Sequence, residues 1–465
     1  GGLIEALKKV EHVPLYEVCL RLWLKLGRSD SMRVFAESRF DFHIRCLSSI
    51  LGVLTILMVY PTSKRLYGGK AALLIAFLLA ISPFHVFWSR IARPYALLPL
   101  VVWLATYLLV LALEQNTFWR WVAYSVAMAL TLYTHYFACF VFVAQSLFFV
   151  LMKAQHRKLS LAKWVGVQAL ILAAFLPWLI VNLGTAVEAS TVQVYYASQA
   201  GLVFKLIYFL FVFSVGWTVH PLNLPIVLPA AVVYGWLFLR GMREILARSD
   251  VEAWLPIPYF ALPLFVGIFV PACDPKHAIG IYPAYSMIIA LGLLSVRVRW
   301  QQALGLAAVV ALSAASLFNY FTNRQYGDAD LVIPWREMVK RVDSGAQPGD
   351  GIVLGYDPEH FRWYYKGNLP TYELSRESYA PQLAELARRH KRLWLIVHLD
   401  DHRERVEAWL NAHGRILDQQ PYQLEEHTLK GLREGLRHIH KYRSYMYCLY
   451  LFGPIRLGGD LSPTI

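Results

Sequence analysis

Ten separate runs of apolar residues constrain the fold of this chain more than any other feature of its sequence. Most of the runs approach the roughly 20 residues that a helix needs to cross about 30 Å of hydrocarbon. One such run could be a buried core helix, but a series of them predicts a polytopic membrane protein. The runs cover residues 44–63, 71–89, 95–113, 119–134, 137–153, 162–183, 224–242, 255–272, 278–296 and 301–319.

The charge and the cysteine content fit this class. The formal net charge of +14 would suggest nucleic-acid binding in a soluble protein. In a membrane protein, basic cytoplasmic loops facing anionic lipid and a site for an anionic substrate explain it, so we expect membrane lipids and no nucleic acid as partners. The 5 cysteines show no paired spacing, which favours packing roles over metal or redox chemistry.

Basic residues in the loops predict the orientation of the spans. Loops 64–70 and 153–163 contain several lysines and arginines, which places both in the cytoplasm by the positive-inside rule. Residues 1–43, 89–94 and 135–137 then lie outside.

The apolar stretch 203–223 decides the orientation of everything after it. It contains Lys205 and Pro221, with Trp217 near its end, and we interpret it as an interfacial or re-entrant segment. Because such a segment does not cross the membrane, the arginines between 240 and 248 become cytoplasmic and residues 274–277 face outside. The count is then roughly ten spans.

Three domains follow from this division. Residues 1–43 are the remainder of a first external loop with interfacial helices, and residues 44–320 form a transmembrane helical domain. From residue 331 to 465 charges are frequent and apolar runs are short, which predicts a soluble α/β domain on the extracytoplasmic side. Its strands are expected at 351–356, 393–397 and 447–452, with helices between them at 334–343, 380–391 and 402–413.

Two arginines stand at an external boundary, where the positive-inside rule expects few. Arg90 and Arg93 follow one apolar run, and Pro94 begins the next. A planar guanidinium can grip a phosphate through two hydrogen bonds, so anion binding is the sharper interpretation. The alternative is that both side chains extend to lipid headgroups.

Two further external loops carry polar residues. His135-Tyr136 closes the next outside hairpin, and Lys276-His277 opens a later span. The three loops share one face in the expected topology, although a lone histidine at a helix end can also be structural. Basic side chains that gather on one external face predict a site for a phosphate or pyrophosphate headgroup.

Five short motifs occur in a fixed order along residues 10–320. They are Pro14-Leu15-Tyr16, Arg45-Cys46-Leu47-Ser48-Ser49, Ser82-Pro83-Phe84-His85 continuing to Arg93-Pro94-Tyr95, Tyr133-Thr134-His135-Tyr136, and Lys276-His277. This series resembles the multi-pass glycosyltransferases of the C-type fold. Within them it is most similar to the bacterial relatives of dolichyl-phosphate-mannose protein mannosyltransferase and of the aminoarabinose transferase of lipid A.

The resemblance implies a transferase in the cell (inner) membrane. Such enzymes move a sugar from a polyprenyl-phosphate carrier to an external acceptor, with inversion at the anomeric carbon. The acceptor would be a cell-envelope lipid, a glycan or a protein, and basic side chains would neutralise the carrier phosphate as it leaves. The residues expected to bind substrate are Arg90, Arg93, Tyr95, His135, Tyr136, Lys276 and His277.

The chain departs from the family pattern at its catalytic acid. The family's general base comes from an Asp-Glu pair upstream of the Pro-Leu-Tyr segment, whereas this sequence begins at Gly1 inside the first external loop. We therefore expect an N-terminally truncated sequence that lacks its base, with Glu37 and Asp41 as weak candidates. Ile91 stands where many relatives have glutamate, and Lys276 replaces an arginine.

Other interpretations stay open. A transporter or flippase for an anionic lipid-linked substrate would use the same cations, but it should show charges inside the spans and related halves. A non-catalytic homologue is compatible with Ile91. No cofactor is firmly implied, and a divalent metal stays open, although no acidic cluster forms a convincing site. A solvated loop is preferred over a metal site for the His398 to His402 cluster.

Overall fold

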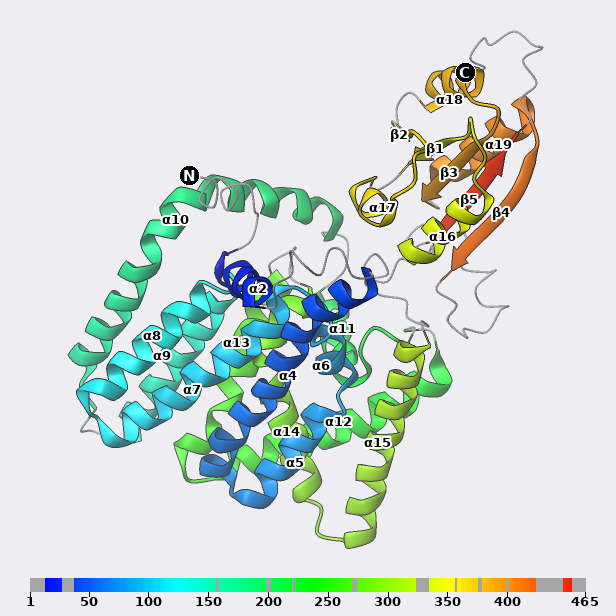
Figure 1. The fold of residues 1–465 in the computed structure, drawn as a ribbon. Coiled ribbons are helices and arrows are strands. Elements are labelled where there is room, and N and C mark those ends of the chain that lie inside the picture. The colour runs from blue at the N-terminus through cyan, green and yellow to red at the C-terminus, as the bar shows by residue number, and fades with distance from the viewer. Residues whose placement is uncertain are drawn as a thin grey trace. The chain divides into compact units, whose positions relative to one another are not determined.

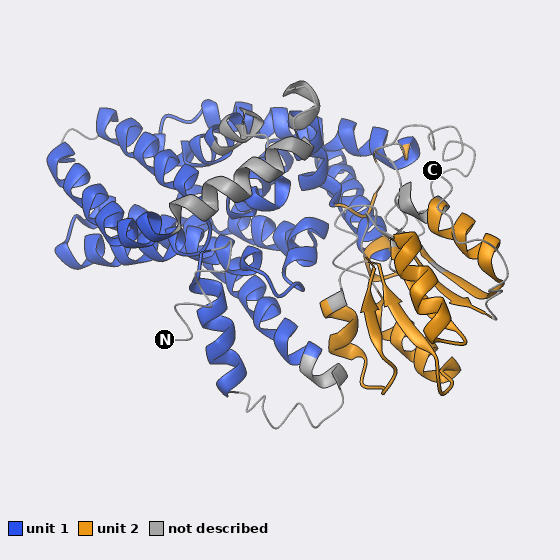
Figure 2. Ribbon diagram, turned by 90° about the horizontal axis from the view of Figure 1, so that it is seen from above, with its two compact units in different colours: residues 1–216, 224–318 blue, residues 217–223, 319–465 orange. Residues whose placement is uncertain are grey.

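The computed structural model divides the chain into two compact units (Figures 1 and 2). The first unit comprises Gly1–Gly216 with Leu224–Phe318, and the second comprises Trp217–Asn223 with Asn319–Ile465. The structure describes residues 13–26, 37–155, 159–197, 202–219, 221, 223–269, 274–322, 334–355, 358–374, 379–398, 401–423 and 446–453.

Among its described residues, the regular secondary structure of the first unit is helical. Long helices lie side by side in Figure 1, and short helices and 3₁₀ turns join them at both ends. The elements are α2 (Leu15–Leu26), α4 (Glu37–Tyr67), α5 (Gly69–Ala80), α6 (Pro83–Trp88), η1 (Pro94–Ala96), α7 (Leu97–Gln115), α8 (Phe118–Leu132), α9 (Ala138–Gln155), α10 (Leu161–Ala197), α11 (Leu202–Val215), α12 (Leu224–Leu246), η2 (Val251–Trp254), α13 (Pro256–Phe269), η3 (Pro275–Ile281), α14 (Tyr282–Leu294) and α15 (Arg299–Phe321).

The prediction of a polytopic helical membrane protein is confirmed. Within the described residues, seven helical segments are long and apolar enough to cross a membrane, where roughly ten spans were expected. The other three runs form the shorter helices α5, α8 and α13, of 12, 15 and 14 residues. The seven segments are Asp41–Tyr67, Pro94–Gln115, Ala138–Gln155, Leu161–Val181, Leu224–Leu246, Pro275–Leu294 and Arg299–Phe321.

The run predicted at 71–89 is interrupted because of its own sequence. Pro83 occupies the first turn of α6, and the Ser82 hydroxyl accepts the His85 backbone N–H at 3.1 Å. A serine cap followed by proline starts a new helix, since proline offers no N–H to continue the preceding one. The first predicted span is longer in the structure than in the sequence prediction, because α4 begins at Glu37, seven residues before the apolar run.

Hydrogen bonds join the loops at one end of the helical unit. The Tyr67 hydroxyl donates to the Ala253 carbonyl at 2.6 Å. Gln155 donates its side-chain amide to the Ser249 carbonyl at 3.1 Å and accepts the Val251 N–H at 3.1 Å. The segment after α12 therefore lies beside the loops after α4 and α9, which are the two loops that the positive-inside rule predicts to be cytoplasmic.

The second unit is built on a mixed five-stranded sheet of order β2-β1-β3-β5-β4. The first three strands are parallel, and β5 pairs antiparallel with both β3 and β4. One face packs against α16 and α17 and the other against α18 and α19, so each face has its own apolar core. The elements are α16 (Trp335–Gly345), β1 (Gly351–Leu354), α17 (Pro358–Tyr364), β2 (Thr371–Glu373), α18 (Tyr379–Arg389), β3 (Leu393–His398), α19 (Asp401–His413), β4 (Ile416–Gln423) and β5 (Met446–Phe452).

Candidate functional site

Three loops distant in sequence meet around Tyr95 in the helical unit. The Tyr95 ring lies 5.6 Å from the His135 ring and 6.1 Å from the His277 ring, measured between centroids. The two imidazoles are 5.4 Å apart. The structure therefore brings together three of the seven residues that the sequence selected for substrate binding. We call Tyr95, His135 and His277 the ring cluster.

Backbone amides fix both imidazoles of the ring cluster. The Phe137 N–H donates to His135 Nδ1 at 3.1 Å, and the Asp274 N–H donates to His277 Nδ1 at 3.3 Å. A neutral imidazole that accepts at Nδ1 carries its proton on Nε2. Each histidine is therefore set as an Nε2–H donor, which is the form that binds an anion.

Local capping positions Lys276 and His277. The Asp274 carboxylate accepts the Lys276 backbone N–H at 3.0 Å, and Pro275 occupies the first turn of η3. His277 completes a reciprocal capping box with Asp274. Asp274 thus caps η3. This cap fixes the backbone of Lys276, the residue that precedes His277 in the sequence.

Apolar rings surround the cluster. The Trp88 ring is 4.5 Å from the Tyr95 ring, and the Phe137 ring is 5.7 Å from the His277 ring. Trp88 is fully buried, and Tyr95 is 4% exposed. A low local polarity strengthens the attraction between the polar edges of this site and an anion.

The arginine segment is held against α4. Ser49 donates its hydroxyl to the Ser89 carbonyl at 3.1 Å, one residue before Arg90. Gly52 permits this approach, because a Cβ there would lie 2.6 Å from the Ser89 Cβ. Arg90 is half-buried and Arg93 is exposed. The backbone is therefore anchored at Ser89, directly before Arg90 and four residues before Arg93.

Tyr136 and Asp41 are not part of the ring cluster. Tyr136 is half-buried in the His135 turn, and among the described residues its ring contacts none of the cluster rings. Asp41 is half-buried in the second turn of α4, so it belongs to a helix and not to a loop as expected. Glu37 begins the same helix, and its side chain lies outside the described residues.

Two residues near the site were not selected from the sequence. Arg45 is exposed on α4, one helical turn before Ser49. The i, i+4 spacing from Ser49 was the available signal for it. Glu17 lies in the first turn of α2, directly after the Pro14-Leu15-Tyr16 motif, and that motif was the signal for it.

The structure offers no obvious metal centre in the part of the chain that it describes. No group of three or more histidine, cysteine, aspartate or glutamate side chains is placed to hold a metal ion there. The cluster that starts at His398 lies partly outside the described residues.

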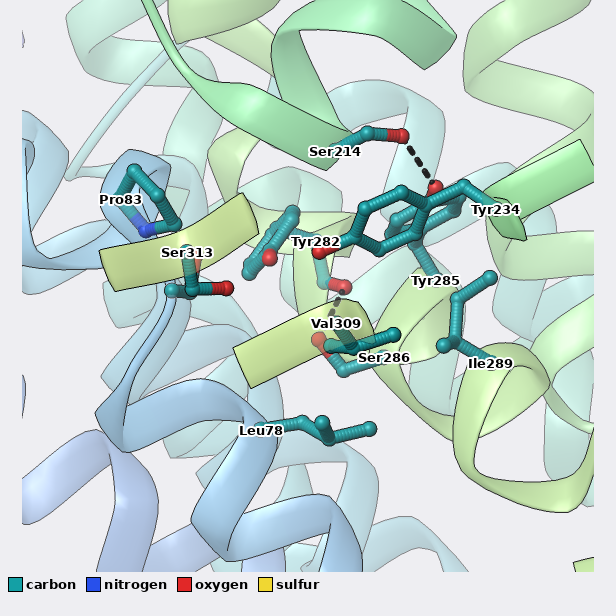
Figure 3. Close-up of a pocket in the computed structure, with 11 residues that line it drawn as sticks. Leu78, Pro83, Ser214, Tyr234, Tyr282, Tyr285, Ser286, Ile289, Val309 and Ser313 are labelled. Carbon is teal, nitrogen blue, oxygen red and sulfur yellow. Dashed lines mark hydrogen bonds between the residues drawn. The ribbon is translucent and has the colours of Figure 1, made fainter. Parts of the chain in front are cut away.

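A second polar feature is a pocket lined mainly by hydroxyl groups (Figure 3). Ser214 donates to the Leu210 carbonyl and lies 2.7 Å from the Tyr285 hydroxyl, so Tyr285 is the donor of that pair. Phe84 and Phe213, both buried, contact Tyr282 on one side. The lining residues are Leu78, Ser82, Pro83, Ser214, Tyr234, Tyr282, Tyr285, Ser286, Ile289, Val309 and Ser313. The lining carries no charge, so this pocket suits water or a neutral hydroxyl group.

Comparison with known proteins supports the resemblance seen in the motifs. Residues 30–181 match the family model described as dolichyl-phosphate-mannose-protein mannosyltransferase. No curated protein sequence matches this chain.

Two crystal structures share the fold. ArnT from Cupriavidus metallidurans bound to undecaprenyl phosphate is 11% identical with a TM-score of 0.53, covering 96% of this chain and 89% of that chain. The apo form of the same protein is 12% identical with a TM-score of 0.53 and the same coverage. The chain therefore has the C-type glycosyltransferase fold that its motifs predicted.

Proposed function

We propose that this protein is a membrane glycosyltransferase. It moves a sugar from a polyprenyl-phosphate carrier to a lipid, glycan or protein acceptor on the extracytoplasmic side of the cell (inner) membrane. The observation that carries this proposal is the meeting of Tyr95, His135 and His277, with both histidines set as Nε2–H donors. Arg90 and Arg93 lie on the loop before Tyr95, and Lys276 directly precedes His277.

The site has the chemistry that such a reaction needs. When the acceptor oxygen attacks the anomeric carbon, the bond to the carrier phosphate breaks and negative charge grows on that phosphate. Fixed donors such as the two Nε2–H groups stabilise this charge without having to reorient. Lys276 and Arg93 add positive charge, and arginine can also bind two phosphate oxygens at once.

Two comparisons support the choice of carrier. The family model that matches residues 30–181 is named for a dolichyl-phosphate-mannose donor. A protein with the same fold, ArnT from Cupriavidus metallidurans, was crystallised with undecaprenyl phosphate. A polyprenyl tail also suits a unit whose outer helix faces are apolar and exposed, for example at Leu228 and Val232 of α12.

The decisive experiment is a turnover assay of the full-length protein in lipid nanodiscs and in sealed vesicles. We expect release of polyprenyl phosphate together with sugar appearing on an envelope acceptor. Transport of the lipid-linked sugar across the vesicle without turnover would identify a flippase and contradict the proposal. Donor binding without turnover or transport would identify a non-catalytic homologue.

A further inference from the structure

Trp103 is fully buried in α7 and binds the segment that carries His277. Its indole Nε1–H donates to the Gly280 carbonyl at 3.1 Å, although the two residues are 177 positions apart in the sequence. A 3₁₀ turn would bond this carbonyl to the N–H of residue 283, but that residue is proline and has no N–H. The indole therefore fixes a carbonyl that the local 3₁₀ turn does not bond.

Gly280 brings η3 close to α7. A Cβ at residue 280 would lie 3.0 Å from Val102 Cγ2 and 3.3 Å from Leu98 Cγ. Side-chain atoms are rarely this close, so a larger residue would push η3 away from α7 by a few tenths of an ångström. The hydrogen bond from Trp103 and the missing side chain of Gly280 thus act together to set the distance between η3 and α7.

The same contact surface continues to the ring cluster. His277 lies one turn before Gly280, and residues three apart in a 3₁₀ helix lie on the same face. Tyr95 likewise lies three residues before Leu98, and its ring is 6.1 Å from the His277 ring. The contact of Gly280 with Leu98 and the contact of His277 with Tyr95 are therefore neighbouring steps of one interface.

The Trp103 ring is itself held in place. The Tyr259 ring of α13 lies 5.8 Å from it. Thr106 donates to the Val102 carbonyl at 2.7 Å and lies 2.7 Å from the Tyr259 hydroxyl, so Tyr259 is the donor of that pair. Trp103, Thr106 and Tyr259 are all fully buried. Because the indole N–H has no water to bond instead, its bond to the η3 backbone is costly to break.

We propose that Trp103 is a positioning residue that holds His277 against Tyr95 in the substrate site. This inference rests on the proposed function. Trp103 acts through the Gly280 carbonyl and not on the substrate. The Nε2–H donor of His277 stabilises the growing charge on the carrier phosphate only at the correct distance, so a shift of η3 relative to α7 weakens that stabilisation.

The test uses Trp103→Phe and Gly280→Ala in the full-length protein, each alone and each combined with His277→Asn. Trp103→Phe keeps an aromatic ring but removes the N–H donor, whereas Gly280→Ala keeps the indole and displaces η3. Binding is measured with polyprenyl phosphate, and single-turnover transfer with a polyprenyl-phosphate-linked sugar. Thermal unfolding reports on folding, and Gly280→Ala decides the question if Trp103→Phe does not fold.

Two matched controls make the same kinds of change elsewhere. Trp121→Phe removes a buried indole N–H that donates to the Asn116 side chain at 2.9 Å. Gly305→Ala places a Cβ 3.2 Å from Leu293 Cδ2. These two residues belong to α8 and α15, which carry none of the ring-cluster residues, so both controls should transfer sugar at about the wild-type rate.

We expect Trp103→Phe and Gly280→Ala to lower the transfer rate about 10-fold and the affinity for polyprenyl phosphate about 3- to 10-fold. Added to His277→Asn, either change should cost less than about 2-fold more, because the group that Trp103 positions is already gone. A merely structural role of Trp103 would instead multiply the losses of the two single variants.

The outcomes separate this inference from the proposed function. Transfer and binding within about 2-fold of wild type in the folded variants would overturn the role of Trp103. Full multiplication of the losses in the double variants would overturn it as well, since it indicates a general destabilisation. Absence of wild-type turnover despite binding of polyprenyl phosphate would reject the proposed function, and the binding measurements would still decide whether Trp103 positions His277.

Discussion

The imidazole rings of His135 and His277 lie 5.4 Å apart, and each accepts a backbone N–H at Nδ1. Two loops that are far apart in the sequence thus present the same donor atom, Nε2–H, within one site. Because each Nδ1 accepts a backbone N–H, each neutral imidazole carries its proton on Nε2. The pair therefore offers two N–H donors to one anion without placing two positive charges side by side.

Replacement of Arg93 by alanine should weaken donor use. Arg93 is exposed at the end of the segment that Ser49 fixes, and a charge-assisted hydrogen bond contributes about 1.5–3 kcal/mol. We expect kcat/KM for the donor to fall about 10- to 150-fold, with partial recovery in Arg93→Lys. Arg297→Ala, an exposed arginine between α14 and α15, is the control, and equal effects of Arg93→Ala and Arg297→Ala would contradict the prediction.

The two nitrogen atoms of His277 can be tested separately. In His277→Asn, the amide oxygen can still accept the Asp274 N–H that now binds Nδ1, whereas the Nε2–H donor is lost. We expect normal folding and a transfer rate lowered about 10- to 100-fold. His277→Gln offers a donor near the Nε2 position and should retain more activity. The reverse order of the two variants, measured by single turnover, would argue for a purely capping role.

Gly52 offers a test that leaves every proposed ligand in place. A Cβ at residue 52 would overlap Ser89 and displace the segment that leads to Arg90 and Arg93. Gly52→Ala should therefore raise KM for the donor several-fold. Gly166→Ala is the matched control, because a Cβ there meets nothing within 4 Å. If both variants bind donor equally well, the position of the Ser89 segment does not matter for binding.

Removal of residues 331–465 should change acceptor use more than donor binding. The ring cluster and its neighbouring cations all belong to the first unit. We expect binding of polyprenyl phosphate to the truncated protein to stay within a few-fold of that of the full chain, while transfer to the natural acceptor falls. Loss of donor binding by a protein that still unfolds cooperatively would show that this division of roles is wrong.

The second unit should lose stability in acid because of Asp350. Burial disfavours its charge, but hydrogen bonds from Arg392, the Gln347 N–H and Trp394 outweigh this and hold the pKa of Asp350 below its usual value. The stabilisation is therefore fully present above the unfolded pKa of about 3.9 and is lost as pH falls through the lower folded value.

This acid sensitivity can be followed by hydrogen exchange in β1 and β3 between pH 5 and pH 2. Asp350→Asn should flatten the pH dependence, because it removes the titrating group. Arg392→Ala should be more harmful, at about 3–5 kcal/mol, because it leaves a carboxylate that is 2% exposed without its cation. An unchanged pH profile in Asp350→Asn would rule this explanation out.

Helices and strands are predicted well where their own residues form a clear apolar pattern. The apolar runs marked the helices of the first unit, and β1, β3 and β5 form at the three predicted strands. β2 and β4 were not predicted, because Thr371–Glu373 is very short and Ile416–Gln423 is mostly polar. The apolar run at 71–89 predicts one span, because its hydropathy hides the break that Ser82 and Pro83 impose.

The sequence by itself determined that this chain crosses a membrane several times, and it selected the three loops that meet around Tyr95. Both conclusions depend on local properties, namely the length of apolar runs and the short motifs at their ends. Only the tertiary structure decided which side chains meet. It joined Tyr95 to His135 and His277 and left Tyr136 aside. Such contacts depend on the packing of helices whose residues are distant in the chain, and no local pattern specifies that packing.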